Sequence, residues 1–129
     1  MSAFILLDTC VASYIFKGDT RAAPYKTCSA GQTPCLSFMT AAELFRWPGM
    51  RNWGETRTQE FHKRVRSFST IQSDDRICWL WAQLMNTPGR PMPRADAWIA
   101  ATALAHSLPL LTHNRKDFEH IAELQLVTP

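Results

Sequence analysis

Four acidic side chains, Asp8, Glu43, Asp96 and Asp117, follow separate apolar segments of the chain. In a parallel α/β sheet, the carboxyl ends of strands and the amino ends of helices share one edge, and ligands bind there. Asp8 directly follows an apolar run, and the other three lie near the starts of expected helices. Carboxylates that meet at one edge repel one another unless a cation lies between them. The set therefore predicts a divalent-metal site with oxygen ligands.

Each acid also has a structural interpretation when it is considered alone. Glu43 matches the last position of a capping box that begins at Thr40. Asp96 and Asp117 fit the first turns of helices, where a negative charge interacts favourably with the helix dipole. Asp8 is harder to explain in this way, because a carboxylate at the end of an apolar strand is costly to bury unless something binds it. The joint placement of all four supports the metal site.

The elements that must position these acids alternate between short apolar strands and helices. Strands are expected at residues 4–7, 36–38, 69–71, 109–111 and 126–127. Helices are expected at residues 11–16, 40–47, 56–68, 74–86, 94–106 and 116–123, with Ser73 as an N-cap. Residues 20–34 and 48–54 are expected to be loops, and residues 89–93 a stiff linker. This alternation predicts an α/β fold in three layers, with a mainly parallel central sheet flanked by helices.

Two segments give the clearest signals. Residues 4–7 form an unbroken apolar run, which is typical of a parallel strand with both faces covered. Residues 94–106 carry alanine at six positions, and side chains this small allow a helix to lie close to a sheet. Together they predict a buried first strand and a tightly packed late helix.

Length and composition set further limits. With 129 residues, of which 46% are hydrophobic, the chain fits one domain spanning residues 1–129. The net charge of +3 permits an RNA partner without requiring one. The apolar run at 3–7 is too short to span a bilayer, so we expect a cytoplasmic protein without a membrane partner. The four cysteines form no zinc-binding pattern and are expected to be free thiols, although a Cys28–Cys35 disulfide is an alternative.

Four motifs in this sequence resemble those of the PIN-domain family. Residues 6–11 (LLDTCV) are similar to the family's opening L-D-T-N-V, and residues 40–44 (TAAEL) resemble its second motif, which ends in a glutamate. Residues 94–103 (RADAWIAATA) resemble D-x-x-I-A-A-T-A, and residues 111–118 (LTHNRKDF) resemble T-x-N-x-x-D-F. The motifs occur in family order across almost the whole chain, and the last two are the most specific.

The resemblance implies a Mg²⁺- or Mn²⁺-dependent endoribonuclease of the VapC-like toxin group. By this analogy the metal ligands and catalytic residues would be Asp8, Glu43, Asp96 and Asp117. Thr9 and Asn114 would bind metal waters or the scissile phosphate. Hydrolysis would leave a 5′-phosphate and a 3′-hydroxyl. The implied partners are an RNA substrate, a cognate antitoxin and a second copy of the chain.

Other residues bear on RNA binding and on departures from the family pattern. Arg94, Arg115 and Lys116 lie close in sequence to the acids, which makes them candidate phosphate-binding residues or ordinary surface charges. Cys10 stands where PIN domains usually carry asparagine, and Arg94 stands where many relatives have a further acid. A thiol is a soft group beside a hard metal, so Cys10 affects the expected metal affinity.

Three other functions are alternatives to a metal-dependent ribonuclease. A non-catalytic PIN-fold module would use the acidic groove only to receive a basic side chain of a partner. An aspartyl-phosphate phosphatase needs D-x-D, and Cys10 occupies the second acidic position. A flap-type DNA nuclease would be larger and would carry more acids. The metal-dependent ribonuclease agrees best with the four acids.

Overall fold

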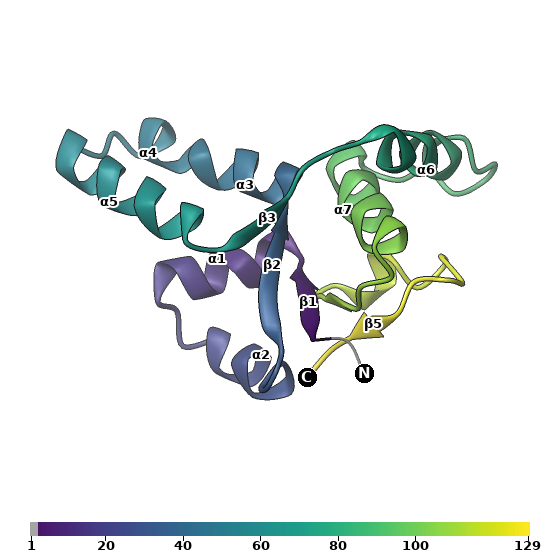
Figure 1. Cartoon of the computed structure of the whole chain (residues 1–129), viewed down its shortest axis with the longest axis horizontal. Helices are drawn as coiled ribbons and strands as arrows, with labels where there is room; N and C mark the ends of the chain where they lie inside the picture. Colours follow the sequence, from purple (N-terminus) through teal and green to yellow (C-terminus); the bar gives the residue numbers. More distant parts are fainter. Residues whose placement is uncertain (1–2) are drawn as a thin grey trace.

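A five-stranded parallel sheet forms the centre of the protein, in a computed structural model that describes residues 3–129 (Figure 1). Its strands are β1 (Phe4–Leu7), β2 (Thr33–Ser37), β3 (Ser69–Ile71), β4 (Leu110–Leu111) and β5 (Leu126–Val127). Their order is β3-β2-β1-β4-β5, and every neighbouring pair is parallel. The expected α/β fold with a mainly parallel sheet is confirmed.

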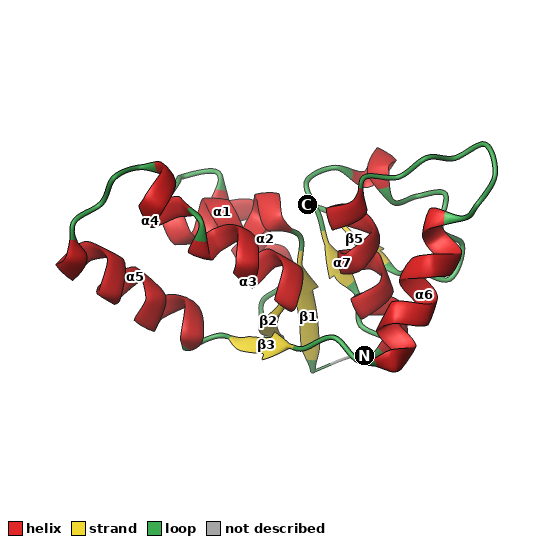
Figure 2. Cartoon of the chain, turned by 90° about the horizontal axis from the view of Figure 1, so that it is seen from above, coloured by secondary structure: helices red, strands yellow, loops and turns green. Residues whose placement is uncertain are grey.

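Helices cover both faces of this sheet. They are α1 (Thr9–Lys17), α2 (Ala22–Cys28), α3 (Phe38–Phe45), α4 (Trp47–Met50), α5 (Glu55–Arg66), α6 (Asp75–Met85), α7 (Arg94–Ala105) and a 3₁₀ turn, η1 (Arg115–Asp117). Seen from above, α1–α5 lie on one side of the sheet and α6 and α7 on the other (Figure 2). This is the expected three-layer arrangement.

The position of β1 between two helical layers explains why its sequence is wholly apolar. Ile5 and Leu7 pack into the core formed with α1, α2, α3 and α5, whereas Leu6 packs into the core formed with α7. All three side chains are fully buried. Alternate residues of a strand point to opposite faces, so a strand between two helical layers needs apolar residues at every position.

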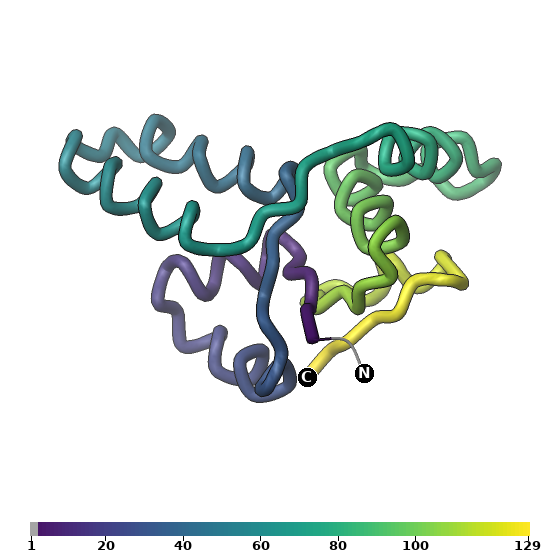
Figure 3. Tube along the Cα trace, in the orientation of Figure 1, coloured from purple at the N-terminus to yellow at the C-terminus, as the bar shows by residue number. Residues whose placement is uncertain are grey.

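The chain changes direction across the sheet beside β1. It runs from β1 to β2 and β3 on one side, and then crosses through α6 and α7 to β4 and β5 on the other, as the chain trace shows (Figure 3). In open α/β sheets, ligands bind outside the carboxyl ends of strands where the strand order reverses. Here that place lies between the ends of β1 and β4, and the amide of Asp8 donates to the carbonyl of Leu111 over 2.9 Å.

The alanine-rich helix packs as its sequence predicts. Ala97, Ala100, Ala101 and Ala103 are fully buried. Helix α7 lies against α6 and β2, and it carries Asp96 in its first turn. The small side chains therefore fix the position of one of the four acids.

The prediction of a loop over residues 20–34 is wrong. Residues 22–28 form α2, and β2 begins already at Thr33. Pro24 lies in the first turn of α2, where a missing N–H removes no bond of the helix. Ala22 and Tyr25 bury their side chains in the core, so tertiary contacts stabilise a helix that the local sequence favours only weakly.

The prediction of a helix over residues 116–123 is also wrong. Only η1 forms, and the chain then continues in turns. Amide-to-carbonyl bonds link Phe118 to Arg115, Ile121 to Phe118, and Leu124 to Ile121. These three-residue turns place the buried side chains of Phe118, Ile121 and Leu124 in the core with α7.

The start of α3 differs from the expected capping box. The helix begins at Phe38, and the Ser37 hydroxyl accepts a hydrogen bond from the Met39 amide. Thr40 is therefore an interior residue of the helix and not its N-cap. Glu43 has no capping role, which removes its structural interpretation.

Two other boundaries differ by small amounts. The expected loop at 48–54 contains the single turn α4 at its start. Helix α6 is capped by Asp74, whose Oδ1 accepts from the Ile77 amide, and not by Ser73. Neither difference affects the acidic edge of the sheet.

The cysteines and the length of the helices bear on two expectations from composition. All four cysteines are free thiols, so the alternative Cys28–Cys35 disulfide is not formed. Across residues 3–129, none of the helices has the length and apolar character that crossing a membrane requires.

Candidate active site

Asp8 lies at the carboxyl end of β1 and caps the start of α1. Its side chain is only 6% exposed, and its Oδ2 accepts a hydrogen bond of 2.8 Å from the Thr112 hydroxyl. Burial raises the pKa of Asp8, and the charge of Asp117 acts in the same direction. Hydrogen bonds from Thr112 and the Thr9 backbone oppose that rise, as does His113. The protein thus buries this carboxyl group and supplies donors that partly offset the cost.

Glu43 approaches the same edge from α3. Its Oε1 accepts a hydrogen bond of 3.1 Å from the Thr9 hydroxyl, which lies 2.9 Å from the Thr40 hydroxyl. Because Thr9 has one hydroxyl hydrogen and gives it to Glu43, Thr40 donates to Thr9. This chain of donors connects α1 to α3 and orients the Glu43 carboxylate.

The pKa of Asp96 gives the most direct evidence that the four acids lie near one another. It is partly buried in the first turn of α7, and its pKa is raised to about 6. Burial is the largest cause, followed by the charges of Asp8, Asp117 and Glu43. Asp117 itself is exposed on η1. The fold therefore brings the four acids close enough for their charges to interact.

The arrangement suits a hydrated ion better than a closed cage. Among residues 3–129, no group of three or more His, Cys, Asp or Glu side chains is arranged to hold a metal ion by itself. Asp8 and Glu43 are each held by a threonine hydroxyl. Mg²⁺ is commonly bound through one or two carboxylates and keeps several of its waters. The donor chemistry of the acids fits such an ion.

Cys10 lies on the exposed first turn of α1, next to these acids. Partial burial raises the pKa of its thiol, and the charges of Asp8, Asp96, Asp117 and Glu43 add to the rise. A thiol with a raised pKa stays protonated at neutral pH and is a poor metal ligand. The residue that departs from the family pattern therefore adds no negative charge to the site.

Thr112 is a residue of this site that the sequence interpretation missed. Its hydroxyl accepts a hydrogen bond of 3.0 Å from the Asn114 amide and donates to Asp8. The signal was present in the sequence, since Thr112 directly follows the strand that ends at Leu111, just as Asp8 follows β1. Asn114 contributes its backbone here, and its side chain is exposed.

The three predicted RNA-contacting cations lie on the elements that carry two of the acids. Arg94 begins α7, and Arg115 and Lys116 belong to η1. All three are exposed, and within residues 3–129 none of them forms an ion pair. Their charges are therefore available to a ligand at the rim of the acidic edge.

The structure defines a class of protein: a three-layer α/β fold with a parallel sheet, in which acids gather where the strand order reverses. The sequence profile of the PIN domain matches residues 5–124, and the chain belongs to the PIN domain family. It is 27% identical over 132 residues to Ribonuclease VapC1 of Haemophilus influenzae strain R2866, with 93% of each chain covered. The resemblance inferred from the four motifs is confirmed.

Solved structures give the same result. The structure of VapBC-1 from nontypeable Haemophilus influenzae has a TM-score of 0.76 and 26% identity, and 97% of each chain is covered. A toxin–antitoxin complex from Klebsiella pneumoniae has a TM-score of 0.77 and 26% identity, again with 97% of each chain covered. The similarity thus extends over the whole fold.

Proposed function

We propose that this chain is a metal-dependent endoribonuclease toxin of the VapC type, which hydrolyses RNA phosphodiester bonds. The observation that carries the proposal is the geometry of the acids at one edge of the sheet, where Thr112 donates to the buried Asp8 and Thr9 donates to Glu43. Burial raises the pKa of Asp96 at this edge to about 6, and the charges of the other three acids add to that rise. Perturbed carboxyl groups that gather at a strand-order reversal are typical of functional sites. The relatives named as VapC ribonucleases support the same activity.

The four acids and two threonines have distinct roles in this proposal. Asp8 and Asp96 would be the principal ligands of Mg²⁺ or Mn²⁺, and Glu43 and Asp117 would hold a second ion or orient the attacking water. A bound divalent ion neutralises phosphate charge and makes hydroxide available near neutral pH. Thr112 holds Asp8 in place through its hydrogen bond. Thr9 donates to Glu43 and so orients it, which makes the effect of Thr9 on the scissile phosphate indirect. The products are a 5′-phosphate and a 3′-hydroxyl.

RNA is held by groups around these acids. Arg94, Arg115 and Lys116 contact phosphates at the rim, where they offset the repulsion between the acids and the RNA backbone. The side chain of Asn114 is exposed beside them and hydrogen-bonds the scissile phosphate. We propose that the protein acts in the cytoplasm, where it would meet RNA substrates.

Protein partners follow from the named relatives. The similar structures include VapBC-1 and a toxin–antitoxin complex, so we propose that a cognate antitoxin neutralises this chain. We also propose a homodimer, which rests only on the resemblance of the four motifs. A non-catalytic module that only receives an antitoxin is the second candidate. It would keep the fold and would use the acidic groove only to receive a basic side chain of its partner, without binding a metal ion.

Cleavage of RNA by the purified chain tests the activity. We expect cleavage with Mn²⁺, loss of cleavage with a chelator, and RNA ends that carry the products given above. Asp96→Asn should abolish cleavage and Mn²⁺ binding measured by calorimetry. Asp75→Asn is the matched control, because Asp75 also lies in the first turn of a helix and is remote in sequence from the acids.

Two outcomes would contradict the proposal. Full activity of the folded Asp96→Asn variant would reject the assignment of the site. A wild-type chain that neither binds Mn²⁺ nor cleaves RNA would favour the non-catalytic module. Circular dichroism of each variant shows whether the fold is retained.

A further inference from the structure

A small open cavity lies on the α1–α2 side of the acidic edge. It has a volume of about 210 Å³ and is lined by Tyr14, Arg21, Pro24, Tyr25 and His113. We call it the Arg21–His113 pocket. It joins α1 and α2 to the loop after β4, and neither the metal site nor the proposed RNA-contacting cations use its residues.

His113 is held in one orientation. The Tyr25 hydroxyl lies 2.7 Å from its Nδ1, and the Tyr14 ring meets the imidazole edge-on at a centroid distance of 5.8 Å. When Tyr25 donates to Nδ1, the ring hydrogen of neutral His113 is on Nε2. The hydrogen bond with Tyr25 engages Nδ1, so Nε2 is the imidazole nitrogen that we expect to contact a ligand.

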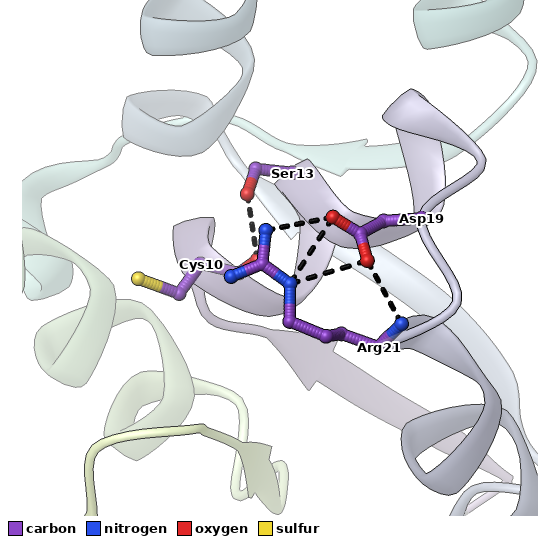
Figure 4. Close-up of polar contacts among 4 residues, drawn as sticks. All are labelled: Cys10, Ser13, Asp19 and Arg21. Atoms are coloured by element: carbon purple, nitrogen blue, oxygen red, sulfur yellow. Dashed lines mark hydrogen bonds and ion pairs between the residues drawn. The ribbon is translucent and has the colours of Figure 1, made fainter.

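Arg21 supplies the positive charge of the pocket. Its Nε and Nη2 donate to Asp19, with a shortest distance of 2.7 Å, and its guanidinium lies 4.3 Å from the centre of the Tyr14 ring. Within residues 3–129, Nη1 makes no hydrogen bond. Figure 4 shows the guanidinium between Asp19 and the first turn of α1, which carries Cys10 and Ser13. Arg21 is thus an exposed cation whose Nε and Nη2 face Asp19, while Nη1 stays available to a ligand.

The pocket adjoins the acidic edge. His113 follows Thr112, the residue that donates to Asp8, and His113 lowers the pKa of Asp8 against the larger effect of burial. The pKa of Arg21 is raised, chiefly by its hydrogen bonds to Asp19. An RNA strand that reaches the acids from this side therefore passes Arg21 and His113.

We propose that the Arg21–His113 pocket binds a phosphate of single-stranded RNA that neighbours the cleaved phosphate. Arg21 Nη1 and His113 Nε2 are the donors, and Tyr25 is a positioning residue that acts through His113. The inference rests on the proposed ribonuclease function. The planar array of N–H donors of a guanidinium is well suited to a phosphate, and donors beside a negatively charged site offset its repulsion of the RNA backbone.

Binding of a short, fluorescently labelled single-stranded RNA of mixed sequence tests the proposal. It is measured by anisotropy in Mg²⁺ with Asp96→Asn protein, so that the probe stays intact. Adding Arg21→Ala should raise Kd about tenfold, as expected for one charge-assisted contact. The slope of log K against log salt should become shallower by about 0.7, the value for one phosphate contact with a single strand.

Asp19→Asn distinguishes RNA binding from a structural role of the ion pair. It removes the negative charge beside Arg21 and keeps a side chain of the same shape, so RNA binding should be unchanged or tighter. If the ion pair only stabilised the fold, Asp19→Asn and Arg21→Ala would weaken binding equally, and that result would overturn the proposal. Thermal unfolding of both variants measures the structural contribution separately.

A double-mutant cycle tests the role of Tyr25. Tyr25→Phe should weaken RNA binding about threefold when His113 is present, as expected for one neutral hydrogen bond. It should have no effect in the His113→Ala variant, because Tyr25 acts through the imidazole. Equal effects in both backgrounds would show that Tyr25 has only a structural role, and would reject its assignment.

Cleavage kinetics separate the two proposals. Arg21→Ala in the otherwise wild-type chain should raise KM about tenfold with kcat unchanged, since the contact is the same in ground and transition states. If the wild type binds RNA without cleaving it, the nuclease proposal fails, while the Kd measurements still test the pocket. If Arg21→Ala leaves Kd for RNA unchanged, or weakens only antitoxin binding, the phosphate pocket is rejected.

Discussion

The Thr112 hydroxyl donates a hydrogen bond of 2.8 Å to Asp8 Oδ2, across 104 positions of the sequence. Thr112 is fully buried and Asp8 nearly so, and the two follow neighbouring parallel strands. The bond fixes one oxygen of Asp8 at the place where the strand order reverses. It also lowers the pKa of a carboxyl group that burial raises. Thr112 thus connects the topology of the sheet to the ionisation of the site.

Replacing Thr112 by valine tests this connection. Valine keeps the side-chain shape but removes the donor to Asp8, so we expect cleavage of RNA in Mn²⁺ to fall about tenfold or more and the free energy of unfolding by about 1–3 kcal/mol. Urea unfolding and initial cleavage rates measure the two effects. Thr112→Ser, which keeps the hydroxyl, should retain most activity. Equal activity of the valine variant and the wild type would show that the bond is unimportant.

Thr9 should matter through Glu43. Thr9→Val removes the hydroxyl that donates to Glu43 over 3.1 Å and that meets Thr40 at 2.9 Å. We expect the cleavage rate to fall about tenfold, because Glu43 loses its orienting donor. Thr9→Ser is the control that restores the hydroxyl. A serine variant as inactive as the valine variant would contradict this explanation.

The stability of the metal-free protein should depend on the ionisation of Asp96. Its pKa is raised from 3.8 to about 6, so between these values the native state binds more protons than the unfolded state. The free energy of unfolding should therefore fall as the pH rises through this range. Above about pH 6, Asp96→Asn should be more stable than the wild type by roughly 1–2 kcal/mol, after allowance for solvent screening.

Urea unfolding at several pH values in chelator measures this effect. Asp75→Asn, in the first turn of α6, is the control and should show no comparable gain above pH 6. Asp8, whose pKa is also raised, contributes in the same direction as Asp96. If Asp96→Asn were less stable than the wild type at pH 8, the destabilisation of the Asp96 carboxylate by burial and by the other acids would be rejected.

The close packing of α7 can be tested at Ala100. This residue is fully buried, so a leucine there would overpack the core and should lower the free energy of unfolding by about 1–3 kcal/mol. Ala105→Leu is a suitable control, because Ala105 is partly exposed at the end of the same helix. Thermal unfolding of the two variants gives the comparison. Equal stabilities would mean that α7 does not depend on small residues.

Features encoded in short stretches of sequence could be predicted without coordinates. The apolar run of β1, the alanine face of α7 and the positions of Asp8 and Asp96 beside these elements all follow from local patterns. Burial on two faces requires apolar residues throughout a strand, and close helix packing requires small residues. These rules depend only on neighbouring positions, so the α/β fold and the four acids were accessible from the sequence.

Features that depend on distant partners were decided by the tertiary structure. The pairing of β4 with β1 places Thr112 beside Asp8, and the packing of α2 places Tyr25 beside His113 across 88 positions. The turns after η1 likewise follow from burying Phe118, Ile121 and Leu124 against the core, and not from local helix propensity. Strand order and packing select such partners, because a hydrogen bond between distant residues forms only where the fold brings donor and acceptor within about 3 Å.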